Sequence, residues 1–188
     1  AQFQDRIPTR CRPSKTWEGI KDDVVLLNKV SDGLARFEVA GIAMGRADNI
    51  SRGVDTLFLL MLQYGTEFYN ENFSQAAFAG QQGGVSLYPG IEALKLLASF
   101  ADEKQRHYAW NEYMVADPTG NKEVEAFAKG QVSMIFGYAY TYDDILNEIK
   151  ALKDKGGSLI EVKDIGVAPA PQLYDPDVSS NKRITYAN

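Results

Sequence analysis

Segments with a helical spacing of apolar residues alternate with short apolar runs along this chain, and the alternation limits the folds open to it. The helical spacing occurs at residues 16–30, 49–65, 89–109, 122–130 and 143–156. The short apolar runs lie at residues 36–45, 131–136 and 164–172. Because elements that alternate in this way form a sheet covered by helices, the sequence predicts the α/β class, with helices packed on a small open sheet.

The first helical segment, TWEGIKDDVVLLNKV, has well-defined signals at its N-terminus. Thr16 is suited to cap the helix, and Glu18 falls in the first turn, where a negative charge is favourable. The pattern therefore predicts an amphipathic helix. The residues expected on its buried face are Trp17, Ile20, Val24 and Leu27.

Two further helices are predicted before residue 110. The segment NISRGVDTLFLLMLQYG is apolar on nearly all sides and stops at Gly65, so it predicts a buried helix that ends at a glycine. Pro89 begins the next segment, which predicts a long amphipathic helix with His107 on its tail, at the surface. The residues expected on the apolar face of that helix are Ile91, Leu94, Ala98 and Ala101.

Composition excludes several classes of function. With 45% apolar and 24% charged residues, the chain of 188 residues is expected to fold around a substantial core. Its formal charge of -5, without a large basic cluster, gives no indication of nucleic-acid binding. Cys11 and His107 are the only cysteine and histidine, which rules out an intrachain disulfide and most metal, haem and Cys–His sites. We therefore expect no cofactor and no metal.

Other signatures of chemistry or membrane association are missing from the sequence. No apolar stretch reaches the roughly 18 residues of a membrane span, and the chain does not start with a signal-peptide pattern. It has no GxSxG, GxGxxG or GxxxxGK[ST] motif. The adjacent acids Asp143 and Asp144 are better explained as charges at the start of a helix than as a catalytic pair. We therefore expect no enzymatic activity.

The stretch GQVSMIFGYAYTYDDI, residues 130–145, runs from strand-favouring residues into alternating tyrosines. If it stays extended, Tyr138, Tyr140 and Tyr142 point to the same side. They would lie at the carboxyl end of a strand, where open α/β sheets bind ligands. A tyrosine offers a flat apolar face and a hydroxyl, which suits the C–H patches and hydroxyls of a sugar. Packing of one or two of these rings against the following helix is an equally good explanation of the pattern.

The order of several motifs resembles the extracellular solute-binding proteins of ABC importers. The chain is similar to the sugar-binding group that includes maltose-binding protein. The matching pieces are PSKTW at Pro13–Trp17, FAKGQVSMIFG at Phe127–Gly137 followed by Tyr138 and Tyr140, and GVAPAP at Gly166–Pro171. Gly19 departs from the family, which has Glu there, and Ser133 stands where the family has Ala.

The resemblance implies the second lobe of a two-lobed, periplasmic-binding-protein-like fold. Residues 13–180 would form that lobe, after an unmatched tail at 1–12 and before a segment at 181–188 that returns toward the hinge and the first lobe. The implied function is substrate capture for an ABC-type importer, with a sugar or oligosaccharide held in a cleft of which this chain supplies one wall. The implied partners are the carbohydrate and the importer membrane subunits, and no nucleic acid. We expect a monomer that works outside the cytoplasm, in the periplasm or as a cell-surface lipoprotein.

By the same resemblance, the aromatic ligand-binding residues are Tyr140 first, then Tyr138 and Tyr142. Polar contacts are expected from Arg46, Asn49 and Asp55, at or just before the buried helix, although Arg46 and Asp55 could equally pair with surface charges. Two other functions stay open. One is a carbohydrate-active enzyme domain with a tyrosine-lined pocket, and the other is a non-catalytic interaction module.

Overall fold

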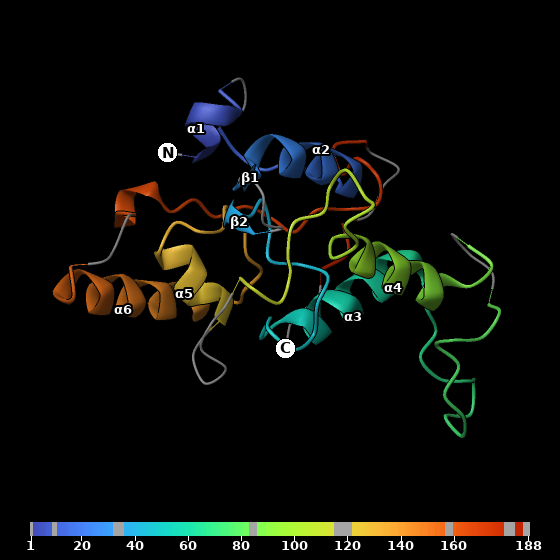
Figure 1. Ribbon diagram of the computed structural model, residues 1–188. Helices are drawn as coiled ribbons and strands as arrows, with labels where there is room; N and C mark the ends of the chain where they lie inside the picture. Colours follow the sequence, from blue (N-terminus) through green and yellow to red (C-terminus); the bar gives the residue numbers. More distant parts are fainter. Residues whose placement is uncertain are drawn as a thin grey trace.

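The computed structural model describes residues 2–8, 11–31, 36–82, 86–114, 122–156, 160–178 and 183–185. Within these ranges, helices cover a small sheet, so the predicted α/β class is confirmed (Figure 1). The helices are α1 (Gln2–Arg6), α2 (Trp17–Leu27), α3 (Gly53–Tyr64), α4 (Pro89–Ser99), α5 (Lys122–Ala128), α6 (Thr141–Asp154) and the 3-10 turn η1 (Val162–Asp164). The strands β1 (Lys29–Val30) and β2 (Phe37–Val39) pair antiparallel.

In Figure 1, α5 and α6 lie to one side of the small sheet, α3 and α4 to the other, and α1 and α2 above it. Helices α3 and α4 pack side by side, and with α2 they surround the largest hydrophobic cluster. Helices α5 and α6 pack on each other around a second cluster that includes Ile145 and Ile149. A third cluster, around Trp110 and Val132, fills the space near the sheet. Because α5 and α6 are anchored in this way, residues 129–140, which join them, are held at both ends.

Helix α2 forms as the sequence predicts. The backbone N–H of Gly19 donates to Thr16 Oγ1 at 3.2 Å, which is the expected N-terminal cap. The four residues predicted on the buried face are all buried. At the other end of the helix, Arg6 Nη1 donates to the carbonyl oxygens of residues 26, 27 and 28 at 3.0–3.2 Å. A cation at a helix C-terminus is favourable, so residues 2–8 support the fold of α2, which the sequence did not indicate.

Among the described residues, the predicted strand at 131–136 forms a single parallel bridge, from Val132 to Ala40. Ala40 donates to Gln131 O at 2.8 Å and accepts from Ser133 N at 2.9 Å, and Ala43 donates to Met134 O at 3.0 Å. The segment thus lies parallel to residues 40–43 and delivers the tyrosine run to the surface. The predicted strand at 164–172 forms only the bridge between Thr16 and Gln172. Two prolines in that segment, at 169 and 171, lack the N–H that a ladder needs.

Helix α4 is shorter than predicted and buries a different face. It ends at Ser99. Its buried residues include Ala93, Leu96 and Leu97, whereas Ile91 and Leu94, on the predicted face, are 37% and 50% exposed. Apolar residues lie on both sides of this segment, so their spacing alone could not decide which side faces α3. Helix α3 ends as predicted, at Gly65 with φ 78°, although its Val54 is 57% exposed instead of buried.

The described residues between α3 and α4, 66–82 and 86–88, project from the body as an arm (Figure 1, green). A bridge between Tyr69 and Ala76 joins its two sides, and Asn70 Oδ1 accepts from Ser74 N at 2.9 Å. A surface hollow of about 550 Å³ lies against residues 67–71 and 73. Phe73 is 79% exposed, and no charged residue occurs between residues 71 and 92. Beyond Glu71 the arm is therefore uncharged in sequence, and its described residues expose aromatic rings.

His107 is buried, and the expectation that it lies at the surface is wrong. Its ring packs edge-on against Phe100 at 4.8 Å between centroids, and its Nε2 is 2.8 Å from Ser99 Oγ. The reason is that α4 ends at Ser99, and the turns that follow bring residues 107–109 back onto the core. Burial and, to a lesser degree, the positive charge of Lys21 lower the pKa of His107 below its ordinary value of 6.5.

The lowered pKa of His107 predicts a pH dependence of stability. Because the unfolded chain binds the proton more tightly than the folded chain, the stability from neutral His107 is fully present above about pH 7.5 and is lost as the pH falls through 6.5. We expect the unfolding free energy to decrease more between about pH 7.5 and 5.5 in the wild type than in His107→Gln. Urea unfolding at these two pH values measures the difference, and equal decreases in both proteins would contradict the prediction.

Candidate functional site

The tyrosine run does not stay extended, so the predicted geometry of its three rings is wrong in part. Tyr140 has φ -68° and ψ -23°, in the helical region, and α6 begins at the next residue. Tyr142 is therefore on the first turn of α6 and is not the third residue of a strand. Even so, the rings of Tyr138 and Tyr140 come together, stacked with 5.6 Å between their centroids and 28° between their planes.

A tight turn before α6 sets this arrangement. The hydroxyl of Thr141 accepts from the N–H of Tyr138 at 3.1 Å, and the N–H of Thr141 donates to Tyr138 O at 3.0 Å. A Cβ on Gly137 would lie 2.7 Å from the side chain of Thr141, so the turn requires glycine at that position. Thr141 is buried and fixes the turn.

The ring of Tyr140 is accessible to a ligand. Tyr140 is 50% exposed and Tyr142 is 38% exposed, whereas Tyr138 is half-buried beneath its neighbour. Packing against α6 therefore does not account for all three rings. A planar apolar surface with a hydroxyl at its edge faces solvent at the N-terminus of α6.

Arg52 completes the cluster from a different element. It is the residue just before α3, and its Cζ lies 5.4 Å from the ring centroid of Tyr140 and 5.5 Å from that of Tyr138. Its Nη1 is 3.4 Å from Asp55 Oδ2, one turn into α3. We call these four residues, Arg52, Asp55, Tyr138 and Tyr140, the tyrosine cluster. The sequence analysis named three of the four and missed Arg52, whose only sequence signal is its three-residue spacing from Asp55.

A buried carboxylate holds the segment that carries Arg52. Glu123, on α5, is 2% exposed and its Oε2 accepts from the backbone N–H of Ser51 at 2.9 Å. Because Ser51 precedes Arg52 directly, this bond ties the start of α3 to α5. Helix α5 in turn packs on α6, which begins next to Tyr140. The two halves of the tyrosine cluster are thus connected through the core.

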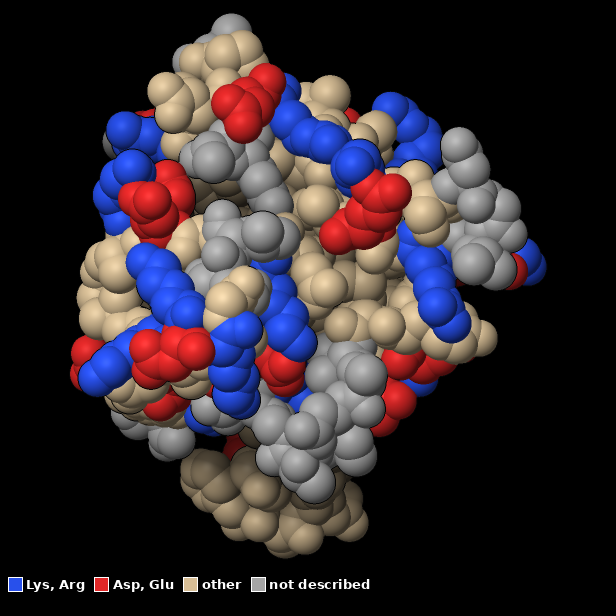
Figure 2. Space-filling view, turned by 60° about the vertical axis from the view of Figure 1, so that its left-hand side comes forward, with Lys and Arg blue, Asp and Glu red and all other residues tan. Residues whose placement is uncertain are grey.

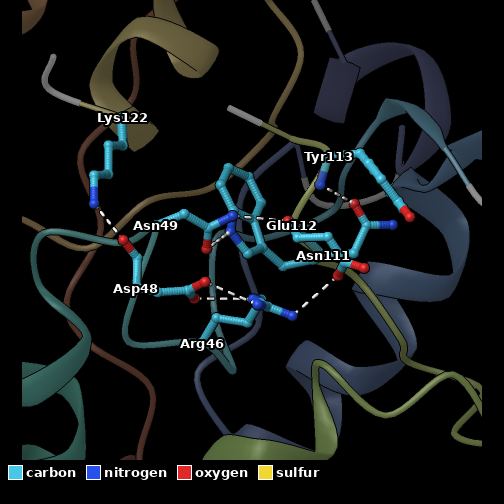
Figure 3. Close-up of polar contacts among 8 residues, drawn as sticks. Arg46, Asp48, Asn49, Asn111, Glu112, Tyr113 and Lys122 are labelled. Carbon is cyan, nitrogen blue, oxygen red and sulfur yellow. Dashed lines mark hydrogen bonds and ion pairs between the residues drawn. The ribbon is translucent and has the colours of Figure 1, made fainter. Parts of the chain in front are cut away.

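Arg46 makes contacts with two acidic side chains instead of the tyrosines (Figure 3). Its Nε and Nη2 donate to the two carboxylate oxygens of Asp48 at 2.9 and 2.8 Å, and its Nη1 lies 3.0 Å from Glu112 Oε2. The hydrogen bonds from Arg46 lower the pKa of Asp48 to about 2. Lys122 Nζ donates to the carbonyl oxygen of Asp48. This pairing with acids is the alternative that the sequence analysis left open for Arg46.

Asn49 is 8% exposed, and both ends of its side-chain amide are engaged (Figure 3). Its Nδ2 donates to Asn111 O at 2.8 Å, and its Oδ1 accepts from Trp110 Nε1 at 2.9 Å. Asn49 therefore joins residues 46–49 to residues 110–111. Its predicted contact with a ligand stays a prediction, as does that of Arg46.

Charges of both signs are interspersed on the face shown in Figure 2, with no continuous basic area over its described residues. Such a surface offers no stripe for a phosphate backbone. Across the described residues, no group of three or more His, Cys, Asp and Glu side chains is arranged to hold a metal. Nor is any helix there long and apolar enough to cross a membrane.

Comparison with models of protein families finds no match, and comparison with curated proteins finds none. One solved structure that is similar in fold is the crystal structure of an ABC transporter solute-binding protein from Thermotoga lettingae TMO, bound with α-D-tagatose. The TM-score is 0.58 with 16% identical residues, and the match covers 80% of this chain and 34% of that chain. This chain thus aligns with about a third of the length of that protein.

This likeness shows the fold alone. The chain has the α/β fold of part of a periplasmic-binding-protein-like structure, in agreement with the fold that the sequence motifs implied. The comparison supports the solute-binding-protein class of fold and does not support the narrower group of maltose-binding protein. The ligand and the biological role remain to be argued from the tyrosine cluster.

Proposed function

We propose that this chain is a ligand-binding lobe of the substrate-capture component of an ABC-type importer. In this proposal a sugar or oligosaccharide stacks on Tyr140 in a cleft between lobes, and this chain supplies one wall. The observation that carries the proposal is the stacked, half-exposed ring pair of Tyr138 and Tyr140 at the start of α6. A second support is the fold, which is shared with part of a solute-binding protein bound to a sugar, α-D-tagatose.

The chemistry of the ring pair suits a sugar. One face of a pyranose or furanose ring shows C–H groups that can lie on the exposed face of Tyr140, while its hydroxyls point to the rim. Tyr142 is exposed on the first turn of α6, and Asp55 offers an acceptor for a hydroxyl. Arg46 and Asn49 join the segment before α3 to residues 110–112 through their hydrogen bonds. The cluster thus has an apolar platform and a polar edge.

The proposal extends to the partners and to the location. The capture component would deliver its sugar to the membrane subunits of the importer, would act as a monomer and would work outside the cytoplasm. No catalytic step is part of this role, because the only function of the site is to bind and release an unchanged ligand.

The binding free energy that one cleft wall can contribute is small. A stacked ring that removes on the order of 60 to 100 Å² of apolar surface from water contributes roughly 2 kcal/mol at about 25 cal/mol per Å². Two rings and a hydrogen bond amount to about 4 to 5 kcal/mol, which corresponds to a dissociation constant in the millimolar range. We therefore expect weak sugar binding by this chain.

The test is binding of D-tagatose and maltose to the wild type and to Tyr140→Ala, measured by ligand-observed NMR and by calorimetry. Loss of the ring is expected to weaken binding roughly 30-fold, the equivalent of about 2 kcal/mol. Tyr113→Ala is the matched control, since Tyr113 is also exposed and also lies beside an arginine, Arg36. Equal affinity of both variants would place the sugar elsewhere, and micromolar or tighter binding by the wild type would contradict the account of a single cleft wall.

A second candidate function, a non-catalytic interaction module, is favoured by one observation. The arm exposes Phe73, Phe78 and Tyr88 on an uncharged segment, as expected of a surface that meets another protein. Sugar binding that depends on Tyr140 would count against this module as the sole function, since Tyr140 is not part of the arm.

A further inference from the structure

The guanidinium of Arg52 lies beside the tyrosine pair and not between its rings. The distances from Cζ to the two centroids are 5.4 and 5.5 Å, and the centroids are 5.6 Å apart. These three nearly equal distances place the guanidinium at the third corner of a triangle, against both rings. Tyr140 is 50% exposed with Arg52 in this position, so part of its side chain stays accessible to a ligand while Arg52 is in place.

Arg52 is also paired with a carboxylate at the same place. Asp55 Oδ2 is 3.4 Å from Nη1, and the side chains of Arg52 and Asp55 are 34% and 26% exposed. The pair carries no net charge, but it presents N–H donors and carboxylate acceptors next to each other on the rim of the aromatic surface. Two adjacent hydroxyls of a sugar need this combination, because each hydroxyl both donates and accepts.

Further acidic residues lie on the elements that adjoin the cluster. Asp143 and Asp144 are on the first turn of α6, which starts next to Tyr140. Glu123 accepts a hydrogen bond from Ser51, the residue before Arg52. An anionic group that approached Arg52 would have to displace or face Asp55 and would be repelled by these acids. The surroundings thus disfavour a ligand with a carboxylate or phosphate.

We infer that Arg52 and Asp55 make the tyrosine cluster selective for a neutral, polyhydroxylated ring over its acidic counterpart, with Arg52 as the specificity-determining residue. The inference rests on the proposed function and deepens it, because it names the class of ligand. Arg52 donates to a ligand hydroxyl while Asp55 accepts from the adjacent one. Contact with both rings also limits the conformations of Arg52, so less entropy is lost when the ligand binds.

The first measurement asks whether the cluster exists in solution, without any ligand. In the ¹H–¹³C spectrum of the labelled chain, ring currents are expected to shift the Arg52 side-chain protons upfield, and Tyr140→Leu should remove much of that shift. Tyr113→Leu is the control, since it should move the protons of Arg36 and leave those of Arg52 in place. Arg52 protons that do not respond to Tyr140→Leu would overturn the inference.

The second measurement compares D-glucose with D-glucuronate, which differ only in the oxidation of one carbon. We expect wild type to bind D-glucose at least about tenfold more tightly, and Asp55→Asn to narrow the difference. Arg52→Met should lose most of the affinity for D-glucose, and Arg52→Lys should recover only part of it, because lysine lacks the planar fork. D-glucuronate binding as tightly as D-glucose, or an unchanged preference in Arg52→Met, would overturn the inference while leaving the proposed function standing. If neither sugar shifts the Tyr140 resonances at about 50 mM, the proposed function fails, and the inference with it.

Discussion

Replacement of Trp17 by alanine is expected to lower the free energy of unfolding by about 4 kcal/mol. Trp17 is 1% exposed, and its indole Nε1 donates to Gln63 Oε1 at 2.6 Å. The substitution leaves a large cavity in the cluster between α2 and α3. It also removes the indole N–H from which the buried Gln63 Oε1 accepts. Gln63 also donates to Pro171 O at 2.8 Å, so a displaced glutamine would loosen the segment bridged to Thr16.

The variant Trp17→Phe separates packing from hydrogen bonding. It keeps most of the ring volume and loses the N–H donor, so we expect a loss of about 1 to 3 kcal/mol, smaller than for alanine. Urea unfolding followed by far-UV circular dichroism measures all of these values. Tyr113→Ala, at an exposed position, should change the stability by less than about 0.5 kcal/mol. A loss below about 1 kcal/mol for Trp17→Ala would show that the indole is not part of the core.

Asn49→Ala is expected to cost about 3 kcal/mol, although the sequence analysis placed Asn49 among ligand contacts. The change leaves Trp110 Nε1 and Asn111 O buried without their present partner, and each such group costs about 1 to 3 kcal/mol. Arg46→Ala is the comparison, because Arg46 and Asp48 form a largely exposed pair that contributes at most about 1 kcal/mol.

Urea unfolding of Asn49→Ala and Arg46→Ala in the same buffer tests this difference. Asn49→Asp should recover little of the stability, since its carboxylate can accept from Trp110 Nε1 but would be buried facing Asn111 O, a second acceptor. If Asn49→Ala is as stable as Arg46→Ala, the amide of Asn49 is not needed in the interior, and its predicted role as a ligand contact gains support.

Local signals predicted helices well where one apolar face was unambiguous. Thr16 at the start of α2 and Gly65 at the end of α3 act as their sequence positions suggested. The buried face of α4 could not be predicted, because Ile91 and Leu94 compete with Ala93, Leu96 and Leu97 and only contact with α3 decides between them. The wrong prediction that His107 lies at the surface has a related cause, since its burial depends on where α4 ends.

Most residue types of the site could be predicted from the sequence, but their arrangement in space could not. The tyrosines were evident in the sequence, but the turn that stacks two of them depends on Gly137 and Thr141, whose close approach no spacing rule reveals. Arg52 is more than eighty residues away in the chain from Tyr138, so their contact follows from the packing of α3, α5 and α6. The tyrosines and Asp55 of the cluster could therefore be predicted from the sequence, and its cation could not.

We propose that a sugar binds on the ring pair of Tyr138 and Tyr140. The most direct measurement is a titration of the chain, with ¹³C-labelled tyrosine and phenylalanine, with D-tagatose, followed by aromatic ¹H–¹³C spectra. The account predicts that the resonances of Tyr138 and Tyr140 shift together and saturate in the millimolar range, while those of Tyr113 stay in place. Shifts confined to Tyr69 and Phe73, which line the hollow of the arm, would contradict the account, as would a spectrum that does not change.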